Sequence, residues 1–150
     1  MGHEVGGVNV SRETFENLQR FSDLVRKWTV KINLVSSSSI PELWERHVVD
    51  SVQIYASAPK SFEKWVDIGS GGGFPGIVMA IIGKEKHPDA SFVLIESDLM
   101  SCNSHQNITE KLNGILKPYA HEERRNRQFS IFIGACIRRS EFIESPSFHK

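Results

Sequence analysis

The sequence has few cysteines, no long apolar run and no excess of charge of either sign. Its two cysteines, Cys102 and Cys136, belong to no CxxC motif, so neither a disulfide framework nor a zinc site is expected. The longest apolar run, residues 77–82, is too short to span a bilayer. The first residues also lack the basic and apolar regions of a signal peptide. We therefore expect a cytoplasmic protein without a membrane anchor.

Charge balance and length narrow the class of protein further. Lysine and arginine together number 18, as do aspartate and glutamate, and 39% of the residues are hydrophobic. The overall charge therefore does not predict a nucleic-acid-binding or membrane-surface protein. A chain of 150 residues is long enough to bury one core but short for two. A single domain over residues 1–150 is expected.

A long amphipathic helix is predicted near the start of the chain. Residues 1–10 are rich in glycine and are expected to be frayed, whereas Ser11 is a good N-cap. Apolar residues then recur at steps of three and four over about five turns. They are Phe15, Leu18, Phe21, Val25, Trp28 and Ile32. The serine run at 36–39 is expected to end this helix, because serine side chains compete for backbone hydrogen bonds.

A second helix is predicted over residues 41–55. Ser39 to Glu42 fits a capping box with a proline in the first turn. The expected buried stripe consists of Trp44, Val48, Val52 and Tyr55. His47 and Asp50, three residues apart, can share one face and hydrogen-bond to each other. A structural pair on the helix surface is the common explanation, and no metal site is expected because no third ligand is in view.

The most informative stretch joins a short apolar strand to an apolar helix through a glycine-rich loop. Residues 64–68 are predicted to form a buried strand of a parallel sheet. Pro75 suits the first turn of a helix that extends to Ile82 and is ended by Gly83. A second apolar strand is predicted over residues 91–95. Strand, loop, helix and strand make a βαβ unit with parallel strands.

The spacing of the glycines separates three classes of ligand. A P-loop would need a lysine after its last glycine, but Ile77 follows Gly76. A dinucleotide-binding loop fits poorly, because its first glycine should follow the strand directly. The loop instead has an acidic residue followed by alternate glycines, namely Asp67, Gly69, Gly71 and Gly73. A loop whose glycines serve only tight packing is the structural alternative.

Two carboxylates favour S-adenosylmethionine as the ligand. Asp67, beside a helix N-terminus, would repel a pyrophosphate but suits a ligand with a cationic amine and a sulfonium. Glu96 is predicted to follow the second strand, where a carboxylate can accept hydrogen bonds from both hydroxyls of an adenosine ribose. The residues around the loop thus predict a site for S-adenosylmethionine.

Residues 66–77 resemble the cofactor loop of the bacterial small-subunit ribosomal RNA methyltransferase G family, also called glucose-inhibited division protein B. The Phe74-Pro75-Gly76 end of the loop is the distinctive part. Other similar positions are Trp28, Asn33-Leu34, Glu45-Arg46-His47, Asp50-Ser51 and Ile95-Glu96-Ser97-Asp98. The resemblance covers about residues 11–98.

The resemblance implies an α/β fold of the class I, Rossmann-like methyltransferases with an N-terminal helical extension. It implies S-adenosylmethionine as methyl donor and, as acceptor, N7 of a guanine in the decoding-region loop of 16S rRNA or of the small ribosomal subunit. By position, Gly69 and Phe74 would contact the cofactor and Glu96 its ribose, while His47 and Asp50 are candidates for shaping the mouth of the site. No catalytic base is assigned, because guanine N7 already presents a lone pair at neutral pH and has only to be positioned.

The last third of the chain does not show the family pattern. A short helix around residues 108–116, a charge-dense segment at 122–127 and an apolar strand candidate within 129–137 are expected there. We therefore expect a fold that is truncated or aberrant after the second strand. One hypothesis is that this tail is out of frame; the absence of a family-like sequence from every downstream frame of the encoding DNA would contradict it.

The expected organisation is one methyltransferase-like domain in three parts. N-terminal helices occupy 11–58, a cofactor-binding βαβ unit occupies 62–98, and a divergent tail occupies 99–150. Two alternatives to an active enzyme remain. The chain could be an inactive cofactor-binding or interaction module, or an NAD-binding protein of the Rossmann type.

Overall fold

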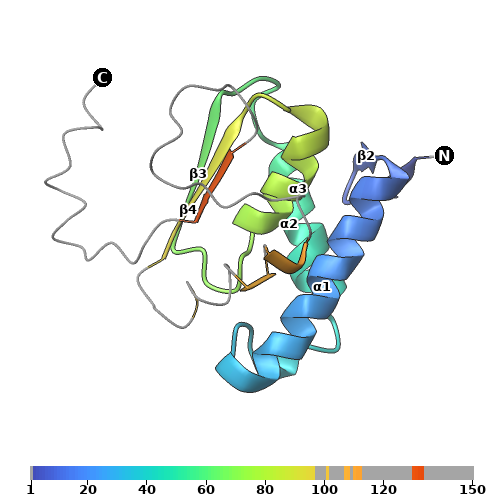
Figure 1. The fold of residues 1–150 in the computed structure, drawn as a ribbon. Helices are drawn as coiled ribbons and strands as arrows, with labels where there is room; N and C mark the ends of the chain where they lie inside the picture. The colour runs from blue at the N-terminus through green and yellow to red at the C-terminus, as the bar shows by residue number, and fades with distance from the viewer. Residues whose placement is uncertain (1, 97–100, 102–106, 109, 113–129, 134–150) are drawn as a thin grey trace, which may run out of the picture.

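The protein forms one parallel sheet with its helices stacked on one side, as the computed structural model in Figure 1 shows. The structure describes residues 2–96, 101, 107–108, 110–112 and 130–133. In chain order the elements are β1 (His3–Val5), β2 (Val8–Val10), α1 (Arg12–Ile32), a 3₁₀ turn (Ser37–Ser39), a π-helical segment (Trp44–Val49), α2 (Asp50–Ala56), β3 (Lys64–Ile68), α3 (Gly76–Lys86), β4 (Ser91–Ile95) and β5 (Ser130–Ile133). No helix among these residues is long and apolar enough to cross a membrane.

The sheet has the strand order β3-β4-β5, and both pairings are parallel. Lys64 pairs with Ser91 at one end of the β3–β4 ladder and Ile68 with Ile95 at the other. The two predicted strands and their parallel βαβ connection are therefore confirmed. The strand candidate predicted within 129–137 is confirmed as β5, which adds a third strand to the sheet. The charge-dense segment 122–127 lies outside the described residues.

Residues 3–10 form a hairpin, so the prediction of a frayed start is wrong for them. β1 and β2 pair antiparallel, and the Val5 and Val10 side chains are buried. Gly6 and Gly7 link the strands with φ of 53° and 84°, the positive values that a two-residue hairpin turn requires. A Cβ on Gly6 would also lie 3.0 Å from the carbonyl oxygen of Val49. Two glycines between short valine-containing runs were the signal for this hairpin.

The first helix agrees with its prediction. The Ser11 hydroxyl accepts a hydrogen bond from the Thr14 N–H at 3.1 Å, as an N-cap should. Its expected apolar face is turned inward: Leu18, Phe21 and Val25 are fully buried, and Phe15, Trp28 and Ile32 are partly buried. The helix ends where Asn33 adopts a left-handed conformation with φ of 50°. The amphipathic pattern therefore predicted both the helix and the face that packs against the core.

Glu85, near the end of α3, ties that helix to the start of α1. Its Oε2 accepts hydrogen bonds from the Ser11 N–H at 2.9 Å and the Thr14 hydroxyl at 2.6 Å, and its Oε1 pairs with Lys86 at 2.7 Å. Burial raises the pKa of Glu85, but the hydrogen bonds from Lys86, Thr14 and Ser11 outweigh burial and lower it to about 2. The ionised carboxylate thus stabilises the contact between α1 and α3.

Replacing Glu85 with alanine is expected to lower the free energy of unfolding at pH 7 by about 1–2 kcal/mol, because the first turn of α1 loses an acceptor. The folded-state pKa of Glu85 lies below its ordinary value of 4.5, so its contribution is fully present above pH 4.5 and lost as pH falls toward 2. Urea unfolding of wild type and Glu85→Ala at pH 7 and pH 3.5 should show a smaller difference at the lower pH. Equal stability at pH 7, or an effect no larger than that of the exposed Glu63→Ala control, would contradict this role.

The second helix begins later than predicted. Residues Trp44–Val49 are π-helical and α2 follows from Asp50, so the helix does not start at residue 41. Ser39 is not its N-cap, because it belongs to a 3₁₀ turn and its hydroxyl donates to the carbonyl oxygen of Ser36 at 2.8 Å. The predicted stripe nevertheless faces the core. Val48 and Val52 are fully buried, and Trp44 and Tyr55 pack against the core.

Gly83 lies inside α3 and does not end the helix as predicted. The helix continues to Lys86, and a Cβ on Gly83 would overlap the ring of Phe92 on β4. Close packing of helix on sheet, rather than helix termination, explains this glycine.

The face of the sheet away from the helices is open at β3, so the prediction of a fully buried strand is wrong. The side chain of Asp67 points to the helix side and is buried, whereas Val66 is 38% exposed and Ile68 is 71% exposed. An apolar run cannot by itself show whether one or both faces of a strand are covered. The helices of Figure 1 cover only one face.

The short helix predicted in the tail is present in part. Residues 107–108 and 110–111 are helical, and the Leu112 N–H donates to the Ile108 carbonyl at 3.0 Å. The side chains of Ile108 and Leu112 are buried in the same core as α1 and α3. The remainder of the predicted helix, to residue 116, lies outside the described residues.

Candidate functional site

The glycine-rich loop between β3 and α3 is fastened to the carboxyl end of β4. The N–H groups of Gly69 and Ser70 donate to the Ile95 carbonyl at 2.8 and 3.2 Å, and Gly73 N–H donates to the Ser70 carbonyl at 2.7 Å. Because β3 and β4 are parallel, the loop and Glu96 lie at the same edge of the sheet. Ligands of open α/β sheets bind at this edge, outside the carboxyl ends of the strands.

The loop glycines that pack against the core are Gly72, Gly73 and Gly76. A Cβ on Gly72 would lie 2.7 Å from the Leu34 carbonyl oxygen, and one on Gly73 would lie 2.6 Å from Cδ1 of Ile77. On Gly76 it would lie 2.8 Å from Cγ of Leu94. Gly73 was predicted to be a cofactor residue, and the structure places it against the protein interior. These three glycines therefore allow the loop to lie close against the core.

Gly69 and Gly71 have a different environment. They have φ of 80° and 49°, a Cβ on Gly69 would meet nothing within 4 Å, and one on Gly71 would approach only the Gly69 carbonyl, at 3.9 Å. Among the residues that the structure describes, none crowds the Cβ side of these two glycines, so a ligand can approach the main chain closely there.

Two buried carboxylates hydrogen-bond to the loop, while their predicted contacts with a cofactor stay a prediction. Asp67 Oδ2 accepts a hydrogen bond from the Gly76 N–H at 2.9 Å, and Glu96 Oε2 accepts one from the Gly71 N–H at 2.7 Å. Both residues are only 9% exposed. Burial raises the pKa of Asp67; the Gly76 hydrogen bond opposes this shift, and the negative charge of Glu96 adds to it. The site therefore favours a positively charged group near Asp67.

Phe74 forms an aromatic contact between the loop and the helices. Its ring centroid lies 5.0 Å from that of Phe21 on α1 and 5.1 Å from that of His47 in the π-helical segment. His47 was predicted to hydrogen-bond to Asp50, but its Nε2 instead lies 3.1 Å from the Ser39 hydroxyl. Burial lowers the pKa of His47; Asp50 opposes this shift, and Arg46 adds to it. Asp50 thus acts on His47 electrostatically, and the imidazole is neutral at pH 7.

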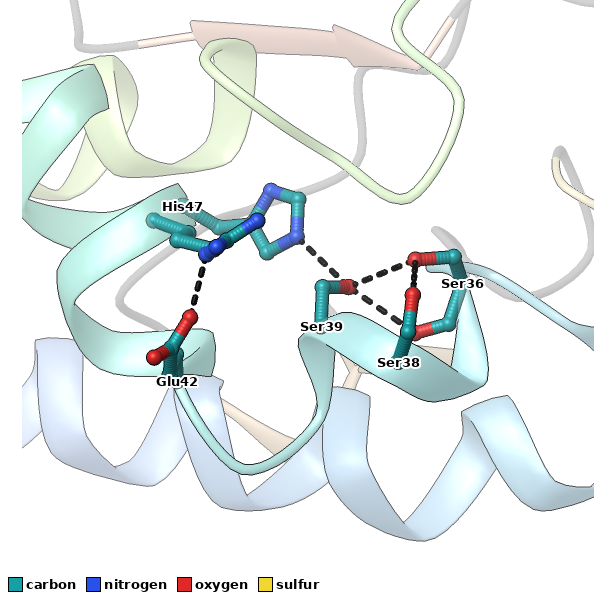
Figure 2. A network of polar contacts seen from close by, with 6 residues as sticks. Ser36, Ser38, Ser39, Glu42 and His47 are labelled. Carbon is teal, nitrogen blue, oxygen red and sulfur yellow. Dashed lines mark hydrogen bonds and ion pairs between the residues drawn. The ribbon is translucent and has the colours of Figure 1, made fainter.

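The serine run holds the partner of His47 in place, which the sequence did not reveal. Figure 2 shows His47 directed at Ser39. Arg46, the residue before His47, pairs with Glu42. The Ser39 hydroxyl is in turn bonded to the hydroxyl and carbonyl oxygens of Ser36, at 3.1 and 2.8 Å. Ser39 lies eight positions from His47, a separation that no helical periodicity predicts. The run, expected only to break a helix, thus fixes the imidazole that contacts the loop.

The Ser70 hydroxyl, inside the glycine loop, is buried and has no hydrogen-bond partner in the part of the chain that the structure describes. Such an unsatisfied group costs about 1–3 kcal/mol, so a partner is expected when the site is in use. The same described residues contain no group of three or more histidine, cysteine or acidic side chains placed to hold a metal ion. With open backbone at Gly69 and Gly71 and two carboxylates at its ends, the loop suits an organic, positively charged ligand.

Known proteins resemble this chain in sequence. A family model described as GidB, rRNA small subunit methyltransferase G, matches residues 14–141. The ribosomal RNA small subunit methyltransferase G of Ruegeria pomeroyi is 55% identical over 91 residues, that of Ruegeria sp. strain TM1040 is 54% identical over 95, and that of Parvibaculum lavamentivorans is 51% identical over 94. These alignments cover 61%, 63% and 63% of this chain but 44%, 46% and 41% of the relatives. The matched part of the chain thus spans less than half the length of those relatives.

The family inferred from the loop is confirmed. The family model extends to residue 141, beyond residue 98, where the sequence analysis placed the end of the resemblance.

Proposed function

Because the chain belongs to the GidB family of rRNA small subunit methyltransferase G proteins, we propose that it serves in the S-adenosylmethionine-dependent methylation of 16S rRNA in the cytoplasm. The proposed acceptor is N7 of a guanine in the decoding-region loop, presented by the RNA or by the small ribosomal subunit. The proposed fold is that of a class I, Rossmann-like methyltransferase. One observation carries the proposal: a glycine loop with open backbone at Gly69 and Gly71 lies between two buried carboxylates, Asp67 and Glu96.

The residues of the loop fit this cofactor chemically. In the proposal, Asp67 attracts the cationic end of the ligand, and Glu96 accepts hydrogen bonds from the ribose hydroxyls. Gly69 and Gly71 allow close backbone approach, and Phe74 contributes an apolar wall. Gly73 supports the loop from the core side, against Ile77.

The proposed mechanism rests on positioning. The bound cofactor supplies a methyl group on a positively charged sulfur, an electrophile that an uncharged ring nitrogen can attack. The protein has to hold the guanine in line and exclude water, and no proton has to be removed first. In the proposal, the neutral imidazole of His47 keeps the Phe74 ring in place. Asp50 influences the charge of that imidazole, so that His47 and Asp50 together shape the mouth of the site. His47 and Asp50 would then be positioning residues.

Two experiments test the function. Calorimetry with S-adenosylmethionine and with NAD is expected to show binding of the first alone, and binding of NAD alone would favour the oxidoreductase alternative. Transfer of a labelled methyl group to small ribosomal subunits that lack this modification is expected for the active enzyme. Binding without transfer would instead identify an inactive cofactor-binding module. Undiminished transfer by His47→Ala would contradict the shaping role of His47.

A further inference from the structure

Two lysines from distant parts of the chain meet at one tryptophan. Lys31 Nζ, in the last turn of α1, lies 5.6 Å from the centroid of the Trp28 ring, and Lys111 Nζ lies 5.2 Å from it. Both distances are within the range of cation–π attraction, which at exposed sites contributes about 0.5–1 kcal/mol. The two ammonium groups are consequently within about one Debye length of each other and repel. The Trp28 cluster, meaning Trp28, Lys31 and Lys111, is thus a small site of concentrated positive charge.

The lysines of the Trp28 cluster differ from the cations that are neutralised on the surface. Arg12, Arg46 and Lys86 each pair with a carboxylate next to them or one helical turn away. Within the described residues Lys31 and Lys111 form no such ion pair, and both residues are exposed. An anion that approached the cluster would therefore meet two cations that form no ion pair with a described carboxylate.

The cluster is linked to the glycine loop by the segment that follows α1. Trp28 is in the final turns of α1, and the chain beyond that helix brings the Leu34 carbonyl oxygen against Gly72 of the loop. Lys111 belongs to the helical residues around Ile108 and Leu112, which share the core with α1 and α3. In Figure 1 this short helical segment, in orange, lies next to α1. An acceptor that reached the loop from this side would pass the cluster.

We propose that the Trp28 cluster binds the phosphodiester backbone of the RNA acceptor and so orients it toward the glycine loop. The proposal rests on the proposed function, which makes RNA the acceptor. Lysine contacts to phosphate fix the position and direction of a nucleic acid but carry no sequence information. The indole holds both ammonium groups in fixed places, so that less side-chain entropy is lost when the phosphate binds.

Substituting both lysines tests the proposal. The double variant Lys31→Gln/Lys111→Gln is expected to bind a fluorescently labelled decoding-region RNA hairpin more weakly at low salt. Its plot of log affinity against log salt should be shallower by about 1.5–2, because two phosphate contacts are lost. Binding of S-adenosylmethionine should be unchanged. The matched control Lys60→Gln/Lys84→Gln removes the same charge from exposed positions outside the cluster and should keep the wild-type slope, as should Lys31→Arg/Lys111→Arg.

The outcomes separate this proposal from the proposed function. An unchanged slope in Lys31→Gln/Lys111→Gln, an equal loss in the Lys60/Lys84 control, or no RNA binding by the wild type would overturn the Trp28 cluster as an RNA contact. Lysine-dependent RNA binding by a wild-type protein that transfers no methyl group would support the contact and reject the enzymatic function.

Discussion

Replacing Asp67 with asparagine is expected to weaken the binding of S-adenosylmethionine by about ten- to a hundredfold. The buried carboxylate favours a cationic ligand, and a charge-assisted interaction contributes about 1.5–3 kcal/mol. The asparagine oxygen can still accept the Gly76 hydrogen bond that Asp67 accepts now, so the loop should keep its shape. Calorimetry on both proteins measures the loss directly.

The pH dependence of binding gives a second readout of Asp67. Its raised pKa means that acidification protonates Asp67 earlier than an exposed aspartate, so wild-type affinity should fall as pH drops through that pKa. The affinity of Asp67→Asn should not show this fall at low pH. An Asp89→Asn control, exposed at the opposite end of the strands, should bind as wild type does. Equal affinity of Asp67→Asn and wild type across pH would exclude Asp67 from the ligand site.

Replacing Gly83 with alanine is expected to lower the free energy of unfolding by about 1–3 kcal/mol. In an exposed helix the same change would stabilise by about 1 kcal/mol, because alanine has the higher helix propensity. At Gly83 the new Cβ would overlap the Phe92 ring, and the cost of overpacking exceeds that gain. Urea unfolding decides between the two effects, since an increase in stability would show that the interface between α3 and β4 can relax.

A double-mutant cycle identifies the contact responsible. Phe92→Leu alone should destabilise the protein, because it removes part of a fully buried ring. In the Phe92→Leu background, Gly83→Ala should cost much less than in wild type, with a coupling of about 1–3 kcal/mol. If the two substitutions had additive effects on the free energy of unfolding, the destabilisation by Gly83→Ala would come from a contact other than the Phe92 ring.

Local patterns predicted the elements whose signal is complete within one segment. The spacing from Phe15 to Ile32 gave α1 and its buried face, and the apolar runs gave β3 and β4 with their bounds. The acidic residue and the alternate glycines predicted a loop between a strand and a helix. Glu96 was expected beside this loop because parallel strands end at the same edge of the sheet, and it does lie there.

Other features depend on partners that are distant in sequence. Whether Gly83 ends a helix or packs inside one is decided by Phe92, and whether β3 is covered on both faces is decided by what lies against it. The same holds in the site, where Ser39 and Phe74, rather than Asp50, contact His47. The hairpin at residues 3–10 does not depend on distant partners, and its two-glycine turn was visible in the sequence. The high glycine content was instead taken to indicate a frayed segment.

The division of the core along the chain has a consequence for how the protein is made. Apart from Ile108 and Leu112, the core residues that the structure describes all precede Glu96. Domains synthesised from the N-terminus can begin to fold before their ends emerge. The layer of α1, α2 and α3 on β3 and β4 can therefore assemble on the ribosome first. β5, joined to β4 across 34 intervening residues, would add to the sheet in a later and slower step, because its pairing with β4 spans more of the sequence than the pairing of β3 with β4.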